Sequence, residues 1–260
     1  MDSFSINKSA EYLINCRKNL KKIDLTEDIP KNEKDAYIIQ NYIHKILNEN
    51  GDKVIGRKIG CTTKVMQDYL HISHPCAGTI REKQCYRSGI VLDYNNYQKV
   101  GVECELAIRL SKDIHYAKKP NIETLYESIK EIITAIEIVD DRYSNWKKFN
   151  ASYLIADDFF SAGCVLGNSK PLFHIMEMGK LEGEMLINGI EVGRGRGNDI
   201  LGNPISALSW LVSRKDIIGE YIPKGQIILL GSLVQTKWLN LGDLVQVNIK
   251  DIGSASVSFK

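Results

Sequence analysis

Two glutamates lie two residues apart in the alternating segment 101–110. Because successive side chains of an extended strand point to opposite sides, Glu103 and Glu105 share one side, and the apolar residues share the other. Their carboxylates would lie about 6–7 Å apart along the strand and repel each other unless a cation lay between them. Hard divalent cations such as Mg²⁺, Mn²⁺ and Ca²⁺ prefer such oxygen ligands. The alternative is the exposed polar face of an ordinary antiparallel strand.

A third glutamate, Glu137, interrupts the nearly continuous apolar segment 132–141. Such a segment is typical of a strand buried on both faces. A buried carboxylate needs a cation or good hydrogen bonds, or it stays protonated. Two explanations remain open from the sequence: Glu137 is a metal ligand, or it forms a salt bridge with an arginine in the core.

A lysine with glycines nearby, Lys58, lies in the apolar segment 54–60. Gly60 would let a ligand or another backbone come close to it. A lysine near a metal-bound carbonyl could shuttle protons or pair with a substrate carboxylate. The alternative is an edge-strand lysine that discourages aggregation.

The elements that must position these residues change character along the chain. Apolar residues at helical spacing predict helices over 7–22 and 31–49, which form a small helical part over 1–52. Residues 53–260 are dominated by short strands, with short helices at 63–70, 121–130 and 204–214. The expected strands cover 54–61, 89–93, 101–110, 131–139, 163–167, 183–193, 225–230, 243–250 and 255–259. Asn188-Gly189 predicts a two-residue hairpin turn within them. The predicted class is α+β, with a mixed, curved β-rich domain after the helices.

Composition excludes several classes of partner. The 34 Lys and Arg and 32 Asp and Glu give a net charge of +2, which is no electrostatic footprint for nucleic acid. No run of 18 apolar residues is present, so we expect no membrane span, and the N-terminus lacks a signal-peptide pattern. The six cysteines are scattered without a C-x-x-C pair, which favours free thiols in a reducing cytoplasm.

Taken together and in order, these segments resemble the fumarylacetoacetate hydrolase superfamily. Within it, the chain is most similar to the 2-keto-4-pentenoate (2-hydroxypenta-2,4-dienoate) hydratases and the 4-oxalocrotonate decarboxylases. The resemblance covers almost the whole chain and depends on an ordered set of short motifs. The main motifs are Gly56-Arg57-Lys58-Ile59-Gly60, Gly78-Thr79, Val102-Glu103-Cys104-Glu105-Leu106-Ala107, Ala135-Ile136-Glu137-Ile138-Val139-Asp140, Arg142 with Trp146, Ala156-Asp157, Ser161, Leu201-Gly202-Asn203-Pro204 and Gly231-Ser232.

The resemblance implies a metal site and a fold. A divalent cation, Mg²⁺ or Mn²⁺, would be held by Glu103, Glu105 and Glu137. Lys58 would be the active-site lysine, and Ser161 would contact the substrate. The implied fold is a β-roll-like mixed sheet with a helical N-terminal part, assembled as homo-oligomers.

The sequence departs from the family pattern at positions expected near the substrate. Cys76 stands where the hydratases usually have an aspartate thought to do acid/base work. Asp158-Phe159-Phe160 replaces the usual Asn-Ala before Ser161, and Asn203 replaces a histidine. We expect Cys76, Asp158 and Phe160 to bind the substrate and to adapt the pocket to a different one.

The predicted function is that of a metal-dependent lyase acting on a 2-keto or 2-hydroxydienoic acid, as a hydratase. The alternatives are a 4-oxalocrotonate-type decarboxylase and an acylpyruvate hydrolase or tautomerase. A further alternative is a non-catalytic subunit that associates with an active paralogue. The expected partners are a small keto acid and further copies of the chain.

Overall fold

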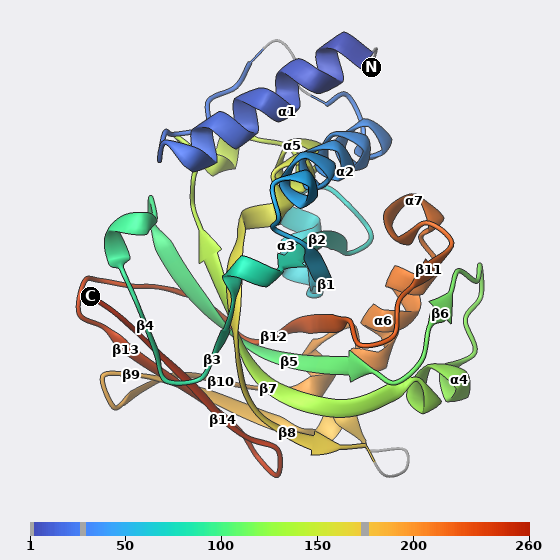
Figure 1. Cartoon of the computed structure of the whole chain (residues 1–260). Coiled ribbons are helices and arrows are strands. Elements are labelled where there is room, and N and C mark those ends of the chain that lie inside the picture. Colours follow the sequence, from blue (N-terminus) through green and yellow to red (C-terminus); the bar gives the residue numbers. More distant parts are fainter. Residues whose placement is uncertain (1–2, 27–29, 173–176) are drawn as a thin grey trace.

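Two N-terminal helices lie above strongly curled β-sheets in the computed structural model (Figure 1). The structure describes residues 3–26, 30–172 and 177–260. Helix α1 spans Ser3–Lys18 and ends before Leu20, whose positive φ of 49° breaks the helical path. The predicted end at residue 22 is therefore wrong. Helix α2 spans Glu33–Glu49 and begins at Asn32, whose side chain caps the backbone N–H of Asp35.

The larger sheet has seven strands and mixed direction. Its order across the sheet is β2 (Cys76–Arg81), β1 (Val54–Gly60), β12 (Ile227–Trp238), β5 (Val100–Leu110), β7 (Ile129–Asp140), β8 (Ser161–Pro171) and β3 (Cys85–Arg87). The β1–β12 and β3–β8 pairs are parallel, and the other pairs are antiparallel.

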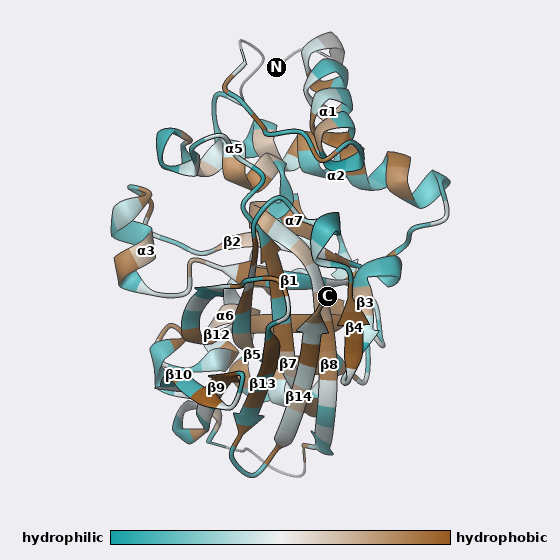
Figure 2. Cartoon of the chain, turned by 90° about the vertical axis from the view of Figure 1, so that its left-hand side faces the viewer, coloured by the Kyte–Doolittle hydropathy of each residue, from teal (hydrophilic) through white to brown (hydrophobic). Residues whose placement is uncertain are grey.

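The smaller sheet packs against the larger one and closes the main core. Its order is β10 (Ile190–Arg196), β9 (Glu182–Ile187), β13 (Leu244–Ile249), β14 (Gly253–Phe259) and β4 (Ile90–Leu92). Strands β13 and β14 contact β7 and β8, and Figure 2 shows these four strands lying together. The predicted hairpin is confirmed, because Asn188 and Gly189 have φ of 54° and 80° between β9 and β10.

Short elements complete the chain at the rim of the sheets. They are the strand pair β6 (Ile114–His115) and β11 (Tyr221–Ile222), and the helices α3 (Lys64–Tyr69), α4 (Ile122–Glu127), α5 (Ala151–Ala156), α6 (Pro204–Val212) and α7 (Lys215–Ile218). The 3₁₀ turn η4 (Asp158–Phe160) joins α5 to β8. Among the described residues, no helix is both long and apolar enough to cross a membrane.

The seven-stranded sheet curls until its two ends meet. The Ser161 hydroxyl at the start of β8 donates a hydrogen bond to the Thr79 carbonyl of β2 over 3.2 Å. The enclosed face carries a small apolar cluster made of Ile80, Ala107, Ile133, Ala135, Cys164, Ile227 and Leu229. Side chains on this same face, farther along β1, β5 and β7, form the candidate site.

The predicted α+β class with a helical N-terminal part and a curved mixed β core is confirmed by this architecture and by the related folds described below. Strand β2 and helix α5 were not predicted. Each is only six residues long, and their sequences lack the alternation or stripe that reveals longer elements.

Candidate metal centre and active site

Strand pairing brings three carboxylates together. Glu103 of β5 lies directly opposite Glu137 of β7, and Glu105 lies two residues farther along β5 on the same face. One oxygen from each of the three side chains lies within 4.8 Å of the other two. The hypothesis of an ordinary exposed polar face does not fit, because Glu105 and Glu137 are each only 1% exposed.

Strand β12 supplies hydrogen bonds that fix two of these carboxylates. The backbone N–H of Gly231 donates to Glu105 Oε2 over 2.9 Å. The hydroxyl of Thr236 donates to Glu103 Oε1. Each of these two carboxylates has a second oxygen that its β12 donor does not bind.

Lys58 is the cation nearest to the cluster. Its ammonium lies 2.9 Å from Glu137 Oε1 and donates a hydrogen bond to the Phe159 carbonyl over 2.6 Å. The edge-strand explanation fails, because β1 lies between β2 and β12 and Lys58 is 3% exposed. The partner of Glu137 is thus a lysine, not the core arginine considered as the alternative.

Two glycines make room for this lysine. A Cβ at Gly60 would lie 3.1 Å from the Phe159 ring, and a Cβ at Gly78 would lie 2.6 Å from the Asp158 carbonyl oxygen and 3.1 Å from Lys58 Cε. The close approach predicted at Gly60 is therefore made by the Phe159 side chain.

Electrostatics of the cluster favour the binding of a cation. Burial, with the charges of Glu137 and Glu103, raises the pKa of Glu105 well above its ordinary value. Burial raises the pKa of Glu137 to about 7, against the opposing effect of Lys58. Burial alone would lower the pKa of Lys58, but Glu137, Glu103 and Glu105 outweigh it and raise the pKa.

The donor set fits a hard divalent cation. When all three carboxylates are ionised, one ammonium leaves two of their negative charges uncompensated, and Glu105 and Glu137 are buried. A divalent ion would balance them and accept oxygen ligands, as Mg²⁺ and Mn²⁺ prefer. Three protein ligands would also leave coordination positions open.

A cavity of about 860 Å³ opens beside the cluster. Lys58 and Glu103 are among its polar lining residues, and Trp146, Phe159 and Phe160 contribute aromatic surface. The Trp146 and Phe160 rings meet edge to face with centroids 5.9 Å apart. The lining thus combines the candidate metal ligand Glu103 with an aromatic wall.

The other residues predicted to contact the substrate lie behind this surface. Of Cys76, Asp158, Phe160 and Ser161, only Phe160 is among the lining residues. The Ser161 hydroxyl is engaged by Thr79. Cys76 is fully buried in β2, where a hydrogen bond with Cys61 and burial raise its pKa well above the ordinary value.

Asn203 has a structural role at its position. Its side chain accepts a hydrogen bond from the Ile205 N–H over 3.1 Å and caps helix α6. The replacement of the family's histidine therefore places a good capping residue at the helix start.

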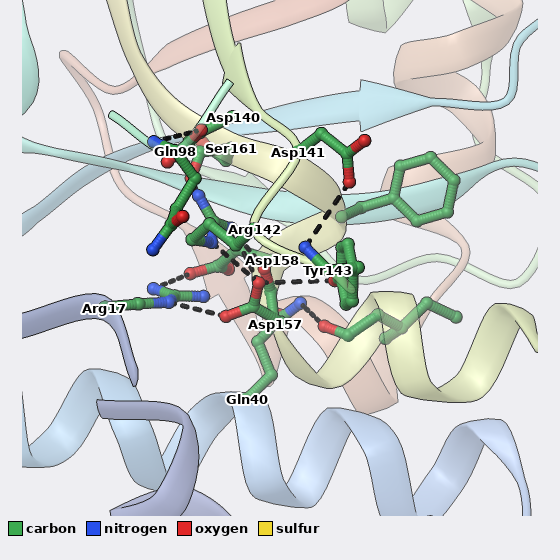
Figure 3. A network of polar contacts seen from close by, with 12 residues as sticks. Arg17, Gln40, Gln98, Asp140, Asp141, Arg142, Tyr143, Asp157, Asp158 and Ser161 are labelled. Atoms are coloured by element: carbon green, nitrogen blue, oxygen red, sulfur yellow. Dashed lines mark hydrogen bonds and ion pairs between the residues drawn. The ribbon is translucent and has the colours of Figure 1, made fainter. Parts of the chain in front are cut away.

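A buried polar network supports the site from the side of the helices (Figure 3). Arg17 of α1 and Arg142 both bind the Asp157 carboxylate, at 2.6 Å and 2.8 Å. The Tyr143 hydroxyl donates to the same carboxylate over 3.3 Å. Asp157 is fully buried, so these partners satisfy a charge that would otherwise be costly.

Several functional candidates were missed by sequence reasoning. Thr236 lies beyond the predicted strand 225–230, and Gly231 contributes a backbone N–H that no side-chain pattern reveals. His44 is a lone histidine on an amphipathic helix, and its partner Asp158 is 114 residues away. A longer apolar window over 227–238 would have extended the predicted strand to include Thr236. The contact of His44 with Asp158 depends on tertiary packing, and no sequence pattern predicts it.

The fold and site place the chain in a known family. Residues 73–259 match the family described as Fumarylacetoacetate (FAA) hydrolase C-terminal, which is most of the chain. The protein therefore belongs to the fumarylacetoacetate hydrolase family, and the predicted family is confirmed. Lys58 precedes the matched region, although it contacts Glu137 inside it.

Individual relatives match over nearly the full length. The chain is 29% identical to the 2-keto-4-pentenoate hydratase of Burkholderia vietnamiensis (strain G4 / LMG 22486) over 226 residues, 86% of this chain and 85% of that protein. It is 27% identical to the 4-oxalocrotonate decarboxylase of Pseudomonas putida over 236 residues, 90% of this chain and 89% of that protein. The structure of 4-oxalocrotonate decarboxylase from Pseudomonas putida G7, complexed with magnesium and adipate, matches with a TM-score of 0.94 and 25% identity. That match covers 100% of this chain and 99% of the other.

Proposed function

We propose that the protein is a divalent-metal-dependent lyase that acts on a 2-keto or 2-hydroxydienoic acid, as a hydratase. The observation that carries the proposal is the convergence of Glu103, Glu105 and Glu137 beside Lys58, with Lys58 and Glu103 lining a cavity. The hydratase and decarboxylase relatives that match nearly the whole chain support it.

Glu103, Glu105 and Glu137 would hold Mg²⁺ or Mn²⁺. When bound, the cation would supply Lewis-acid polarisation to the keto group of the substrate. The carboxylates themselves orient the site, because β5 and β7 fix them in a hydrogen-bonded register. The Gly231 N–H and the Thr236 hydroxyl keep Glu105 and Glu103 from rotating away.

Lys58 would hold the substrate carboxylate or move a proton at Nζ. An ammonium has three N–H donors. The Phe159 carbonyl accepts from one, and Glu137 lies 2.9 Å away as an ion-pair partner. Lys58 also lines the cavity, so a further donor would be available to a bound acid. Proton transfer needs this hydrogen-bond reach before any matching of pKa values.

The aromatic wall would bind the carbon chain of the substrate and exclude water. Phe159 and Phe160 are the residues of the replaced Asp158–Phe160 segment that line the cavity. For Ser161, Cys76 and Asp158 we propose supporting roles, because their side chains contact other protein groups instead of the cavity.

The test is to incubate the protein, loaded with Mg²⁺ or Mn²⁺, with 2-hydroxypenta-2,4-dienoate and to follow loss of the dienol absorbance. Product analysis should show one hydrated product, and a chelator should abolish the reaction. Two carbon fragments would indicate a hydrolase, and a simple isomer a tautomerase. If metal-loaded protein leaves this dienol and related unsaturated keto acids unchanged, the proposal fails.

Decarboxylation is the second candidate. The favouring observation is the match with 4-oxalocrotonate decarboxylase over the entire chain. Release of CO₂ from an unsaturated keto diacid, without hydration of the dienol, would establish this reaction.

We further propose that the protein forms homo-oligomers and works in a reducing cytoplasm. The family resemblance supports the first statement. The free thiols of all six cysteines support the second, including Cys85 and Cys164 with sulfur atoms 3.7 Å apart. Light scattering that gives the mass of one chain would contradict the oligomer.

A further inference from the structure

The turn η4 has an unusual backbone. Asp158, Phe159 and Phe160 have φ of 56°, 48° and 65° in succession. Side chains with a Cβ rarely adopt this left-handed region, and a run of three such residues is strained. Strain of this kind persists only where the surrounding structure holds it in place.

The carboxylate of Asp158 is the point at which the turn is held. It accepts hydrogen bonds from the Thr79 N–H at 3.2 Å and the Thr79 hydroxyl at 3.1 Å. His44 Nε2 lies 2.9 Å from both of its oxygens, and Arg17 Nη1 lies 3.3 Å from Oδ2. Figure 3 shows Arg17 reaching toward Asp157 and Asp158 from α1.

The residue that follows acts directly on Lys58. The Phe159 carbonyl accepts the hydrogen bond from Lys58 Nζ, and the Phe159 ring lies 5.2 Å from the same nitrogen. A shift of the turn would therefore move both contacts at once. Gly78 tightens this arrangement, because the Asp158 carbonyl occupies the space that a side chain there would need.

We propose that His44 and Asp158 are positioning residues for Lys58. The chain of contacts runs from His44 on α2 to the Asp158 carboxylate, through the left-handed turn to the Phe159 carbonyl, and so to Lys58 Nζ. Neither His44 nor Asp158 lines the cavity, so their effect on the reaction must pass through this chain. The N-terminal helices therefore help to position a residue that lines the cavity.

A direct test measures the state of Lys58 without any substrate. Reductive methylation with formaldehyde and a borohydride, followed by mass spectrometry, reports the reactivity of each lysine. In Asp158→Ala and His44→Ala, the methylation rate at Lys58 should rise several-fold. The rates at exposed lysines, such as Lys18 and Lys250, should not change.

Matched variants separate positioning from a general loss of stability. Tyr37→Phe removes another buried polar contact between α2 and β2, the hydrogen bond from the Ala77 N–H at 3.1 Å. We expect it to lower the melting temperature while Lys58 keeps its slow methylation. Asp158→Asn retains an oxygen for the Thr79 N–H and should restore most of the protection lost in Asp158→Ala.

The activity arm of the test rests on the proposed function. In Asp158→Ala and His44→Ala, kcat for the dienol should fall about 10- to 100-fold, because small misplacements of a reacting group cost that much. The affinity for Mn²⁺ measured by calorimetry should stay within a factor of about two, because Glu103, Glu105 and Glu137 are untouched.

The outcomes are distinct. If folded Asp158→Ala and His44→Ala leave both the methylation rate of Lys58 and kcat as in the parent, the positioning role is overturned. The positioning role is also overturned if Tyr37→Phe raises the methylation rate of Lys58 as much as Asp158→Ala and His44→Ala do. If the parent protein has no activity on any dienol or keto acid, the proposed function fails, while the methylation result still decides the role of His44 and Asp158.

Discussion

Glu103 and Glu137 face each other as direct partners in the antiparallel pairing of β5 and β7. Like charges at directly opposite positions destabilise a strand pair. Glu105 adds a third carboxylate at 1% exposure, and Lys58 compensates only part of this charge. The sheet thus gives up stability at the place where a divalent cation would restore it.

Neutralising Glu105 should separate stability from metal binding. Burial and two neighbouring carboxylates raise the pKa of Glu105, so Glu105→Gln should leave the metal-free protein as stable as the parent or more stable. Mn²⁺ at about 100 times its Kd should stabilise the parent by about 2.7 kcal/mol, and this gain should vanish in the variant. Thermal unfolding with and without Mn²⁺ measures both effects.

Glu131→Gln is the control for this comparison. It removes a partly exposed carboxylate of β7 that pairs at 2.7 Å with Arg109, a residue of the same strand as Glu105. We expect it to keep the full stabilisation by Mn²⁺. Equal responses of the two variants would contradict a metal site at Glu105.

Adding a methyl group at Gly78 should disturb the turn that carries Phe159. The new Cβ would lie 2.6 Å from the Asp158 carbonyl oxygen, which is backbone and cannot rotate away. We expect Gly78→Ala to cost about 1–3 kcal/mol of stability and to accelerate methylation of Lys58. Gly89→Ala strains a backbone with φ of 88° but has no atom within 4 Å, so it should leave Lys58 protected even if it lowers stability. Protection of Lys58 in Gly78→Ala would argue against the close packing.

The stability contributed by Asp158 should depend on pH in a defined direction. Burial alone would raise its pKa, but His44, Arg17 and Arg81 outweigh burial and hold the pKa well below the ordinary value. A depressed folded-state pKa gives stability that is complete above the unfolded pKa of about 3.9 and is lost as pH falls further.

Asp158→Asn tests this dependence. Breaking a buried ion pair typically costs about 3 kcal/mol, so urea unfolding at pH 7 should show a deficit of that order. The deficit should be constant down to about pH 5 and should shrink below about pH 4, where the parent loses its advantage. A deficit that grows on acidification would contradict the assigned direction.

Shortening Phe160 should weaken substrate binding more than it slows the reaction. Phe160 lines the cavity, whereas the metal ligands and Lys58 belong to other elements. Phe160→Ala should raise KM about tenfold, the effect expected for losing an apolar contact of about 1.4 kcal/mol. Phe160→Leu should have a smaller effect. Steady-state kinetics would refute the contact if KM stayed unchanged in both variants.

Much of the fold could be predicted because its long elements carry clear patterns. The alternation over 101–110 and the apolar segment over 132–141 correspond to β5 and β7. The irregular part of β12 was missed, because register shifts between 229 and 237 interrupt its alternation. The division at residues 52 and 53 stays a prediction, since polar contacts such as that of His44 with Asp158 cross it.

The candidate site was predicted only in part, for a physical reason. The alternation placed Glu103 and Glu105 on one face, and burial singled out Glu137. The strand register that puts Glu137 opposite Glu103 depends on tertiary structure and cannot be read from either strand alone. The burial of Asp158 away from the cavity depends on tertiary structure in the same way. The sequence shows that Asp158 is polar and differs from the family pattern, but not whether its side chain faces the ligand or other protein groups.

The contacts of Arg17 and His44 limit how this enzyme could be recombined with its relatives. The family match begins at residue 73, so α1, α2 and the strand β1 with Lys58 all precede it. Yet Arg17 and His44 both bind Asp158, which lies inside the matched region. A chimera that takes residues 1–72 from a relative would place foreign helices and a foreign β1 against this turn, so we expect these helices, β1 and the turn to work only when they are exchanged together.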